Sequence, residues 1–147
     1  MARDSTQRER HGFPLVLDLQ RATHAVGLRI EADLEDLGIS QAEAHVLALL
    51  HEGGQQTVGD LQRGLQHRAS TLSGILERLE RRGYVTRSLN KADRRSLLVT
   101  LTRSGQRAAA RVADTLRAIE QGATKAAGAT SVAGFTKVAR ALAEPEQ

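Results

Sequence analysis

The sequence contains no cysteine and no tryptophan, and only one tyrosine and two phenylalanines occur among its 147 residues. The absence of cysteine excludes disulfides, thiolate metal sites and redox-sensing thiols from this chain. Because aromatics are scarce, a core must be built from Leu, Val, Ile and Ala, which favours packed helices over an aromatic-rich β-sandwich.

Long apolar runs are also absent, and none approaches the roughly 20 residues that a membrane-spanning helix needs. Residues 1–12 are polar and charged and lack the apolar stretch of a secretory signal peptide. These absences favour a cytoplasmic protein without a membrane partner. The length is that of one domain, which we expect to cover residues 1–147.

The motifs of common enzyme sites are missing as well, namely Gly-x-Gly-x-x-Gly, a Walker-type loop and a Gly-x-Ser-x-Gly elbow. The histidines form no pair at i, i+4 spacing and have no cysteine beside them, as a strong zinc site would. We therefore predict that the chain is not an enzyme and has no cofactor and no metal site. The histidines are His11, His24, His45, His51 and His67.

Positive charge is concentrated in the middle of the chain, although the net charge of the whole is only +4. Residues 59–107 hold eleven Lys or Arg against four Asp or Glu, a balance of +7, and the remainder has a balance of −3. A basic segment of this kind is typical of a surface that contacts a polyanion. A solvated charged surface is the alternative interpretation.

Apolar residues recur at helical spacing in six segments. Ser40 and Glu43 form the Ser-x-x-Glu pattern of a capping box, which predicts a helix start. Gly38, Gly83 and Gly128 are predicted to end helices. We expect helices over about residues 13–37, 41–53, 57–65, 69–82, 102–127 and 131–143.

Two of these helices, 57–65 and 69–82, are short and joined by a tight turn, which is the organisation of a helix-turn-helix. Residues 84–89 and 97–101 are rich in β-branched and large apolar residues, and a polar segment between them predicts a hairpin. A hairpin in this position is a wing. The sequence thus predicts a mainly α fold, a winged helix-turn-helix lobe over about residues 40–102 with a two-stranded wing.

The terminal helices carry apolar stripes that would have little to cover in a monomer. Exposed patches of that size usually mark an interface. We therefore predict dimerisation helices over about residues 13–37 and 103–144, and a homodimer. The alternative is that these helices fold back on their own lobe.

Residues 93–102, DRRSLLVTLT, fit the wing pattern Asp-x-Arg-x-x-x-x-x-Leu-Thr of the MarR (multiple antibiotic resistance regulator) transcription factors at every fixed position. Residues 76–85, LERLERRGYV, resemble the exit of that family's recognition helix, and residues 103–105, RSG, resemble the start of its long dimer helix. The resemblance covers nearly the whole chain. It implies a homodimer that binds a pseudo-palindromic operator in duplex DNA and regulates transcription. Repression by occupying a promoter is the expected outcome, and activation is the alternative, because the sequence does not give the position of the operator.

The predicted wing tip carries three cations and one carboxylate, Lys91, Asp93, Arg94 and Arg95. Arginines at a hairpin tip can reach into the minor groove, whose negative potential attracts guanidinium groups. The resemblance assigns that insertion to Arg95. Asp93 is expected to orient an arginine rather than to approach phosphate.

The start of the helix over residues 69–82 is predicted to face DNA, because its leucines face the core. Arg68 can reach a guanine or a phosphate, and Arg78 is expected at the backbone. Gly74 lies at the position where many members of the resembled family carry arginine. We therefore expect Arg68 and the wing to make a larger share of the DNA contacts. Ser70 has the helix N-cap as its alternative role. The predicted contacts are His67, Arg68, Ser70, Thr71, Ser73 and Arg78.

Members of this family often bind aromatic or amphipathic ligands where the dimer helices meet the DNA-binding lobe. The resemblance therefore implies a small-molecule effector, and the candidate lining residues are His24, Leu28, Arg29 and His45. A function of a different class is the alternative: a winged-helix protein-interaction module that presents the same basic face to an acidic partner, without DNA specificity.

Overall fold

Six α-helices and a small antiparallel sheet make up residues 12–144, the part of the chain that the computed structural model describes. The mainly α winged helix-turn-helix fold predicted from the sequence is confirmed. The elements are α1 (Pro14–Asp33), the 3-10 helix η1 (Glu35–Leu37), α2 (Gln41–Gly53), β1 (Gln56–Thr57), α3 (Val58–Leu65), α4 (Ala69–Arg81), β2 (Val85–Leu89), β3 (Leu97–Leu101), α5 (Arg103–Ala127) and α6 (Ala129–Ala143).

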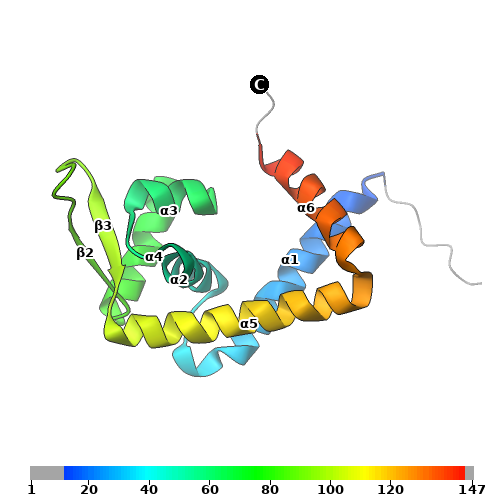
Figure 1. Ribbon diagram of the computed structural model, residues 1–147, viewed down its shortest axis with the longest axis horizontal. Coiled ribbons are helices and arrows are strands. Elements are labelled where there is room, and N and C mark those ends of the chain that lie inside the picture. Colours follow the sequence, from blue (N-terminus) through cyan, green and yellow to red (C-terminus); the bar gives the residue numbers. More distant parts are fainter. Residues whose placement is uncertain (1–11, 145–147) are drawn as a thin grey trace, which may run out of the picture.

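The long helix α5 joins two groups of elements (Figure 1). Helices α2, α3 and α4 and the sheet gather around its N-terminal half, and α1 and α6 lie toward its C-terminal end. The first group is the winged lobe that the sequence predicts. The second group contains the helices that the sequence assigns to a dimer interface.

The hydrophobic core lies where α2 packs against α5 and is covered by α3, α4 and the sheet. Ala109 and Val112 of α5 are fully buried beside this helix, and the alanine lets the two helix axes approach closely. The other fully buried side chains of the lobe are mostly leucines. They include Leu47, Leu50, Leu61, Leu72, Ile75, Leu76, Leu79, Val85 and Val99.

Short polar motifs start the helices of this lobe. Ser40 and Glu43 form the predicted capping box at the start of α2, with the Glu43 backbone N–H donating to Ser40 Oγ at 3.3 Å. Thr57 and Asp60 form a second capping box at α3. Thr102 is the N-cap of α5 and accepts a hydrogen bond from the Gly105 N–H.

The sheet has three strands in the order β1-β3-β2, all antiparallel. The wing itself is the predicted hairpin, in which Leu89 lies opposite Leu97 and Val85 opposite Leu101. The third strand is the addition: Gln56 and Thr57 pair with the other edge of β3. This pairing leaves no local signal in the sequence, because it joins Gln56 to Val99 and Thr57 to Leu98.

Two predicted helix ends are wrong. The first helix does not continue to residue 37 but ends at Asp33, and a separate 3-10 turn, η1, carries the chain to Gly38. Gly38 adopts φ 59°, a left-handed conformation that glycine reaches without strain. The last helix begins at Ala129, two residues before the predicted start, because Gly128 ends α5 and leads directly into α6.

The terminal helices α1 and α6 bury little of their apolar surface. No residue of α6 is buried, and Phe135 is 50% exposed. Phe13, Leu15, Val16, Leu28, Val138 and Leu142 are also exposed. None of the helices in residues 12–144 combines the length and the apolar character needed to cross a membrane.

The wing and α5 meet at Gly105. A Cβ atom at this position would overlap the carbonyl oxygen of Tyr84, which leads into β2. Thr102 fixes the same junction, because its hydroxyl donates to the Gly83 carbonyl at 2.6 Å and its N–H donates to that of Tyr84 at 3.0 Å. The close approach therefore requires glycine at position 105.

Gly105→Ala is expected to lower the free energy of unfolding by about 2–3 kcal/mol, because the new methyl group must displace the backbone at the base of the wing. Gly122→Ala, also within α5, is the matched control, since nothing lies within 4 Å of its added Cβ. That change should raise stability by roughly 0.5–1 kcal/mol. Thermal denaturation measures the stability of both variants. Equal changes in stability for Gly105→Ala and Gly122→Ala would contradict the close approach at Gly105.

Candidate nucleic-acid interface

Helix α4 presents a polar face to solvent because its apolar face is entirely used in the core. Leu72, Ile75, Leu76 and Leu79 are buried, whereas the side chains between them point outward. The turn before α4 contains Gln66, whose φ of 53° is the only positive value of a non-glycine residue in the described part of the chain. This turn sets the angle between α3 and α4.

The predicted contact residues at the start of α4 lie mostly as expected. Arg68, Ser70, Thr71 and Ser73 are exposed. The open alternative for Ser70 is resolved against a capping role, because Arg68 occupies the N-cap position without a side-chain capping bond and Ser70 is the second helical residue. His67 differs from the others: it is half-buried, and its Nε2 atom is buried without a hydrogen-bond partner among the described residues.

Arg78 is engaged inside the protein. Its Nε donates to Oε1 of Glu43 at 2.7 Å, and Glu43 is only 2% exposed whereas the Arg78 side chain is 46% exposed. The second oxygen of Glu43 accepts the Ser40 N–H at 3.0 Å. Arg78 thus ties α4 to the start of α2, a role that the sequence analysis did not predict.

A second ion pair ties the wing to α4. Arg87 of β2 donates through both Nη2 and Nε to Oε2 of Glu80, at 2.6 and 3.1 Å. The hydrogen bond from Arg87 lowers the pKa of the Glu80 carboxyl below its usual range. This ion pair therefore fixes the orientation of the hairpin relative to α4.

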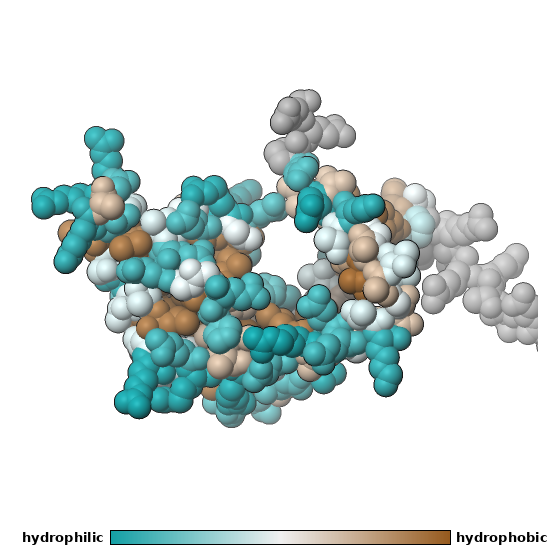
Figure 2. Space-filling model, in the orientation of Figure 1, coloured by the Kyte–Doolittle hydropathy of each residue, from teal (hydrophilic) through white to brown (hydrophobic). Residues whose placement is uncertain are grey.

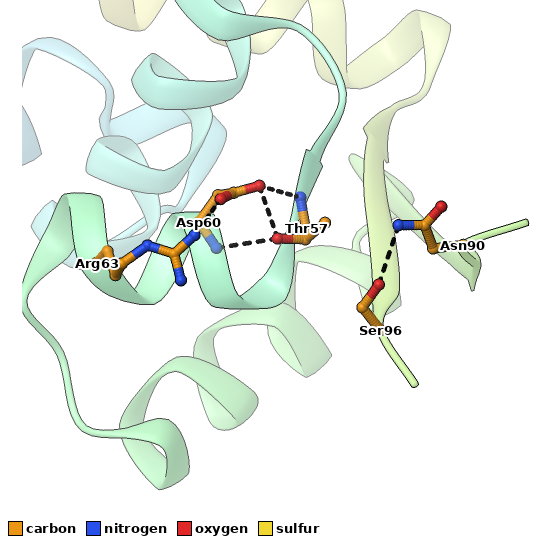
Figure 3. Close-up of polar contacts among 5 residues, drawn as sticks. All are labelled: Thr57, Asp60, Arg63, Asn90 and Ser96. Carbon is orange, nitrogen blue, oxygen red and sulfur yellow. Dashed lines mark hydrogen bonds and ion pairs between the residues drawn. The ribbon is translucent and has the colours of Figure 1, made fainter. Parts of the chain in front are cut away.

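Local hydrogen bonds shape the wing tip. Asn90 Nδ2 donates to Ser96 Oγ at 3.0 Å and closes the hairpin (Figure 3). Asp93 Oδ1 accepts the backbone N–H of Arg95 at 3.0 Å. Asp93 therefore holds an arginine, as expected, but through the backbone rather than through the guanidinium group.

The cations of the wing tip, Lys91, Arg94 and Arg95, are all exposed. None of the ion pairs within residues 12–144 involves them. Their charge is consequently not neutralised by the described part of the protein. The tip can contact an anion without first breaking an internal ion pair.

Helix α3 carries one further exposed cation that the sequence did not single out, Arg63. Figure 3 shows it beside Asp60, which also accepts hydrogen bonds from the hydroxyl and N–H of Thr57. These bonds from Thr57, followed by the charge of Arg63, lower the pKa of the Asp60 carboxyl. The spacing of Arg63, three residues after the capping residue Asp60, is the sequence pattern that could have predicted this ion pair.

The remaining histidines are not gathered into one site. Burial, and then the proximity of His67, lower the pKa of His45 below its ordinary value of 6.5. His24 and His51 are exposed, and His11 lies outside the described residues. Within residues 12–144, no group of three potential metal-ligating side chains of His, Asp or Glu comes together.

The candidate effector residues do not line either of two hollows along α5. One hollow, of about 480 Å³, is bordered by residues of the C-terminal half of α5, and the other, of about 240 Å³, lies between α2, β3 and the start of α5. On α1, His24, Leu28 and Arg29 are exposed, and Arg29 binds Asp33 at 2.7 Å. Their role in ligand binding stays a prediction.

Residues 39–97, from the residue before Ser40 to the first residue of β3, match the model of the MarR family. The chain is 37% identical over 87 residues to the transcriptional activatory protein BadR of Rhodopseudomonas palustris. The aligned region covers 56% of this chain and 47% of BadR. It is 27% identical over 95 residues to the transcriptional repressor MdtR of Bacillus subtilis, covering 62% of this chain and 61% of MdtR. The chain spans about half the length of the curated relatives it matches.

A solved structure agrees with these matches. The fold is similar to that of overoxidised AbfR bound to DNA, with a TM-score of 0.71 and 26% identity, over 87% of this chain and 89% of that chain. The likeness extends to the terminal helices as well as to the winged lobe.

Arg78→Met is expected to lower the free energy of unfolding by about 2 kcal/mol, because the buried Glu43 carboxylate loses its counter-charge. Glu43→Gln combined with Arg78→Met should recover part of that loss, since no buried charge remains. Chemical denaturation of wild type, both single variants and the double variant measures the coupling. An Arg78→Met variant as stable as the wild type would show that the pair does not hold α4.

Proposed function

Through residues 39–97 the chain belongs to the MarR family of transcriptional regulators, a family that is not enzymatic, and from this premise we propose that it binds duplex DNA as a homodimer. One observation carries the proposal: an exposed polar helix face lies beside a hairpin whose three cations form no ion pair with any other residue of 12–144. Such a pairing of a polar helix with a basic wing fits two adjacent grooves of DNA.

In this proposal α4 enters the major groove with its N-terminal turns foremost. Arg68 contacts a guanine or a phosphate, and Ser70, Thr71 and Ser73 contact base edges or the backbone. Arg78 contributes mainly by holding α4 to α2 through Glu43, and its exposed part is the portion that can reach a phosphate. His67 supports the turn rather than reading a base, because it is half-buried.

The wing enters the neighbouring minor groove. Arg95 inserts its guanidinium there, Arg94 and Lys91 contact the flanking phosphates, and Asp93 keeps the turn in shape through the Arg95 N–H. The Glu80–Arg87 pair fixes the hairpin relative to α4, so that both elements meet DNA in one arrangement.

The homodimer is proposed to form through α1, α6 and the C-terminal part of α5. The support is the apolar surface that these helices leave uncovered in one copy of the chain, with Phe135 half exposed and no buried residue in α6. A two-fold dimer places two α4 helices on successive turns of DNA, which predicts a pseudo-palindromic site.

We further propose repression, in which the bound dimer occupies a promoter. BadR is named an activator and MdtR a repressor, so whether a regulator of this fold activates or represses depends on the position of its operator and not on the fold.

A small-molecule effector that contacts His24, Leu28, Arg29 and His45 stays part of the proposal. The competing function, a winged-helix module for an acidic protein partner, predicts no preference for duplex DNA.

Arg95→Ala should weaken duplex binding at least tenfold and lower the slope of log Kd against log salt by about one, because one cation no longer displaces counterions. Fluorescence anisotropy with genomic duplex fragments, at several salt concentrations, gives both values. Arg21→Ala is the matched control, since it removes an exposed arginine of α1 far from the wing. Unchanged affinity in a folded Arg95→Ala protein would favour the protein-interaction module.

Phe135→Asp is expected to convert the dimer into a monomer, because a carboxylate would be buried against apolar side chains of the partner copy. Thr130→Asp adds the same charge to α6 away from that apolar side and should leave the dimer intact. Sedimentation equilibrium reports the mass of each variant. A wild-type chain that sediments as a monomer would contradict the proposed dimer.

A further inference from the structure

An uncovered pair of leucines lies on the wing just before its tip. Leu89 and Leu97 are directly opposite each other on β2 and β3, and they are 65% and 38% exposed. The Asn90–Ser96 hydrogen bond follows immediately, so the pair ends the apolar part of the hairpin. Exposing two leucines side by side is unfavourable in water, so we expect a binding partner to cover them.

The register shows which way the pair faces. Alternate side chains share a face of a sheet, so Leu89 lies on the same face as Val85 and Arg87. Val85 is buried in the core and Arg87 binds Glu80 of α4. The leucines therefore continue the face that looks toward α4, beyond the point where the core ends.

The surroundings of the pair are cationic. Lys91, Arg94 and Arg95 follow within the same turn and are exposed. Figure 2 shows hydrophobic surface at the end of the molecule that carries the hairpin, next to hydrophilic side chains that project from it. An apolar patch beside three cations that form no ion pair within residues 12–144 fits a partner that is a polyanion with a carbon-rich surface.

We propose that Leu89 and Leu97 pack against the deoxyribose rings of the DNA strand that separates the groove read by α4 from the groove entered by the wing. The inference rests on the proposed function and adds to it an apolar contact. Deoxyribose supplies the carbon-rich face, and its phosphates meet the neighbouring cations. Burial of apolar surface releases no counterions, so this contribution to affinity is independent of salt.

Salt dependence separates this contact from the ionic ones. Leu89→Thr combined with Leu97→Thr removes the apolar surface but keeps residues that favour strands. The double variant should bind a duplex fragment about tenfold more weakly at every salt concentration, with the same slope as the wild type. Leu89→Ile combined with Leu97→Ile is the matched control, which keeps the apolar surface and should bind like the wild type.

The experiment is anisotropy titration at four salt concentrations, with the melting temperature and the sedimentation of each free protein measured alongside. If the double threonine variant melts early, Leu89→Thr alone replaces it, because Leu89 is the more exposed residue and adds little to the core. The inference is supported by a parallel loss of affinity in a folded, unchanged dimer.

Four results would overturn the inference. Unchanged affinity would show that DNA does not cover the pair. A reduced slope, like that of Arg95→Ala, would show that the leucines only place the arginines, and a change in oligomeric state would assign the patch to a second copy of the chain. If the wild type binds no duplex, the proposed function itself fails, and this inference fails with it.

Discussion

The buried carboxylate of Glu43 is the constraint on which the orientation of α4, the helix proposed to enter the major groove, depends. One of its oxygens caps α2 through the Ser40 N–H, and the other binds Arg78 of α4. A carboxylate removed from water is tolerated only when such partners are present, so the start of α2 and the middle of α4 must keep their relative positions. The buried residues of α4 then determine which of its faces is exposed and available for the proposed DNA contact.

Further contacts fix the positions of the wing and of α5 relative to α4. The Glu80–Arg87 pair joins α4 to the wing, and the Thr102 hydroxyl with the close approach at Gly105 joins the base of the wing to α5. Since α5 leads directly to α6, a shift at the proposed dimer interface would change the spacing of the two winged lobes in the proposed dimer. Control of DNA binding by a ligand near α1 would act through this spacing.

Elements specified by neighbouring residues could be predicted from the sequence, and contacts between distant residues could not. The capping boxes at Ser40 and Thr57, the hairpin and the long helix after Thr102 all follow from local patterns. The pairing of β1 with β3 and the bond between Glu43 and Arg78 join positions far apart, and neither leaves a periodic signal. For the same reason the half-burial of His67 was missed, because it depends on helix α2 packing beside the turn.

The most direct test of the account is selection of duplexes from a random library by the wild-type chain. The account predicts enrichment of inverted half-sites whose centres lie about one helical turn apart, roughly 10 base pairs, because two α4 helices of a two-fold dimer must reach the same face of DNA. A library without any enriched sequence, or with a single asymmetric half-site, would contradict the claim that this chain reads DNA as a symmetric dimer.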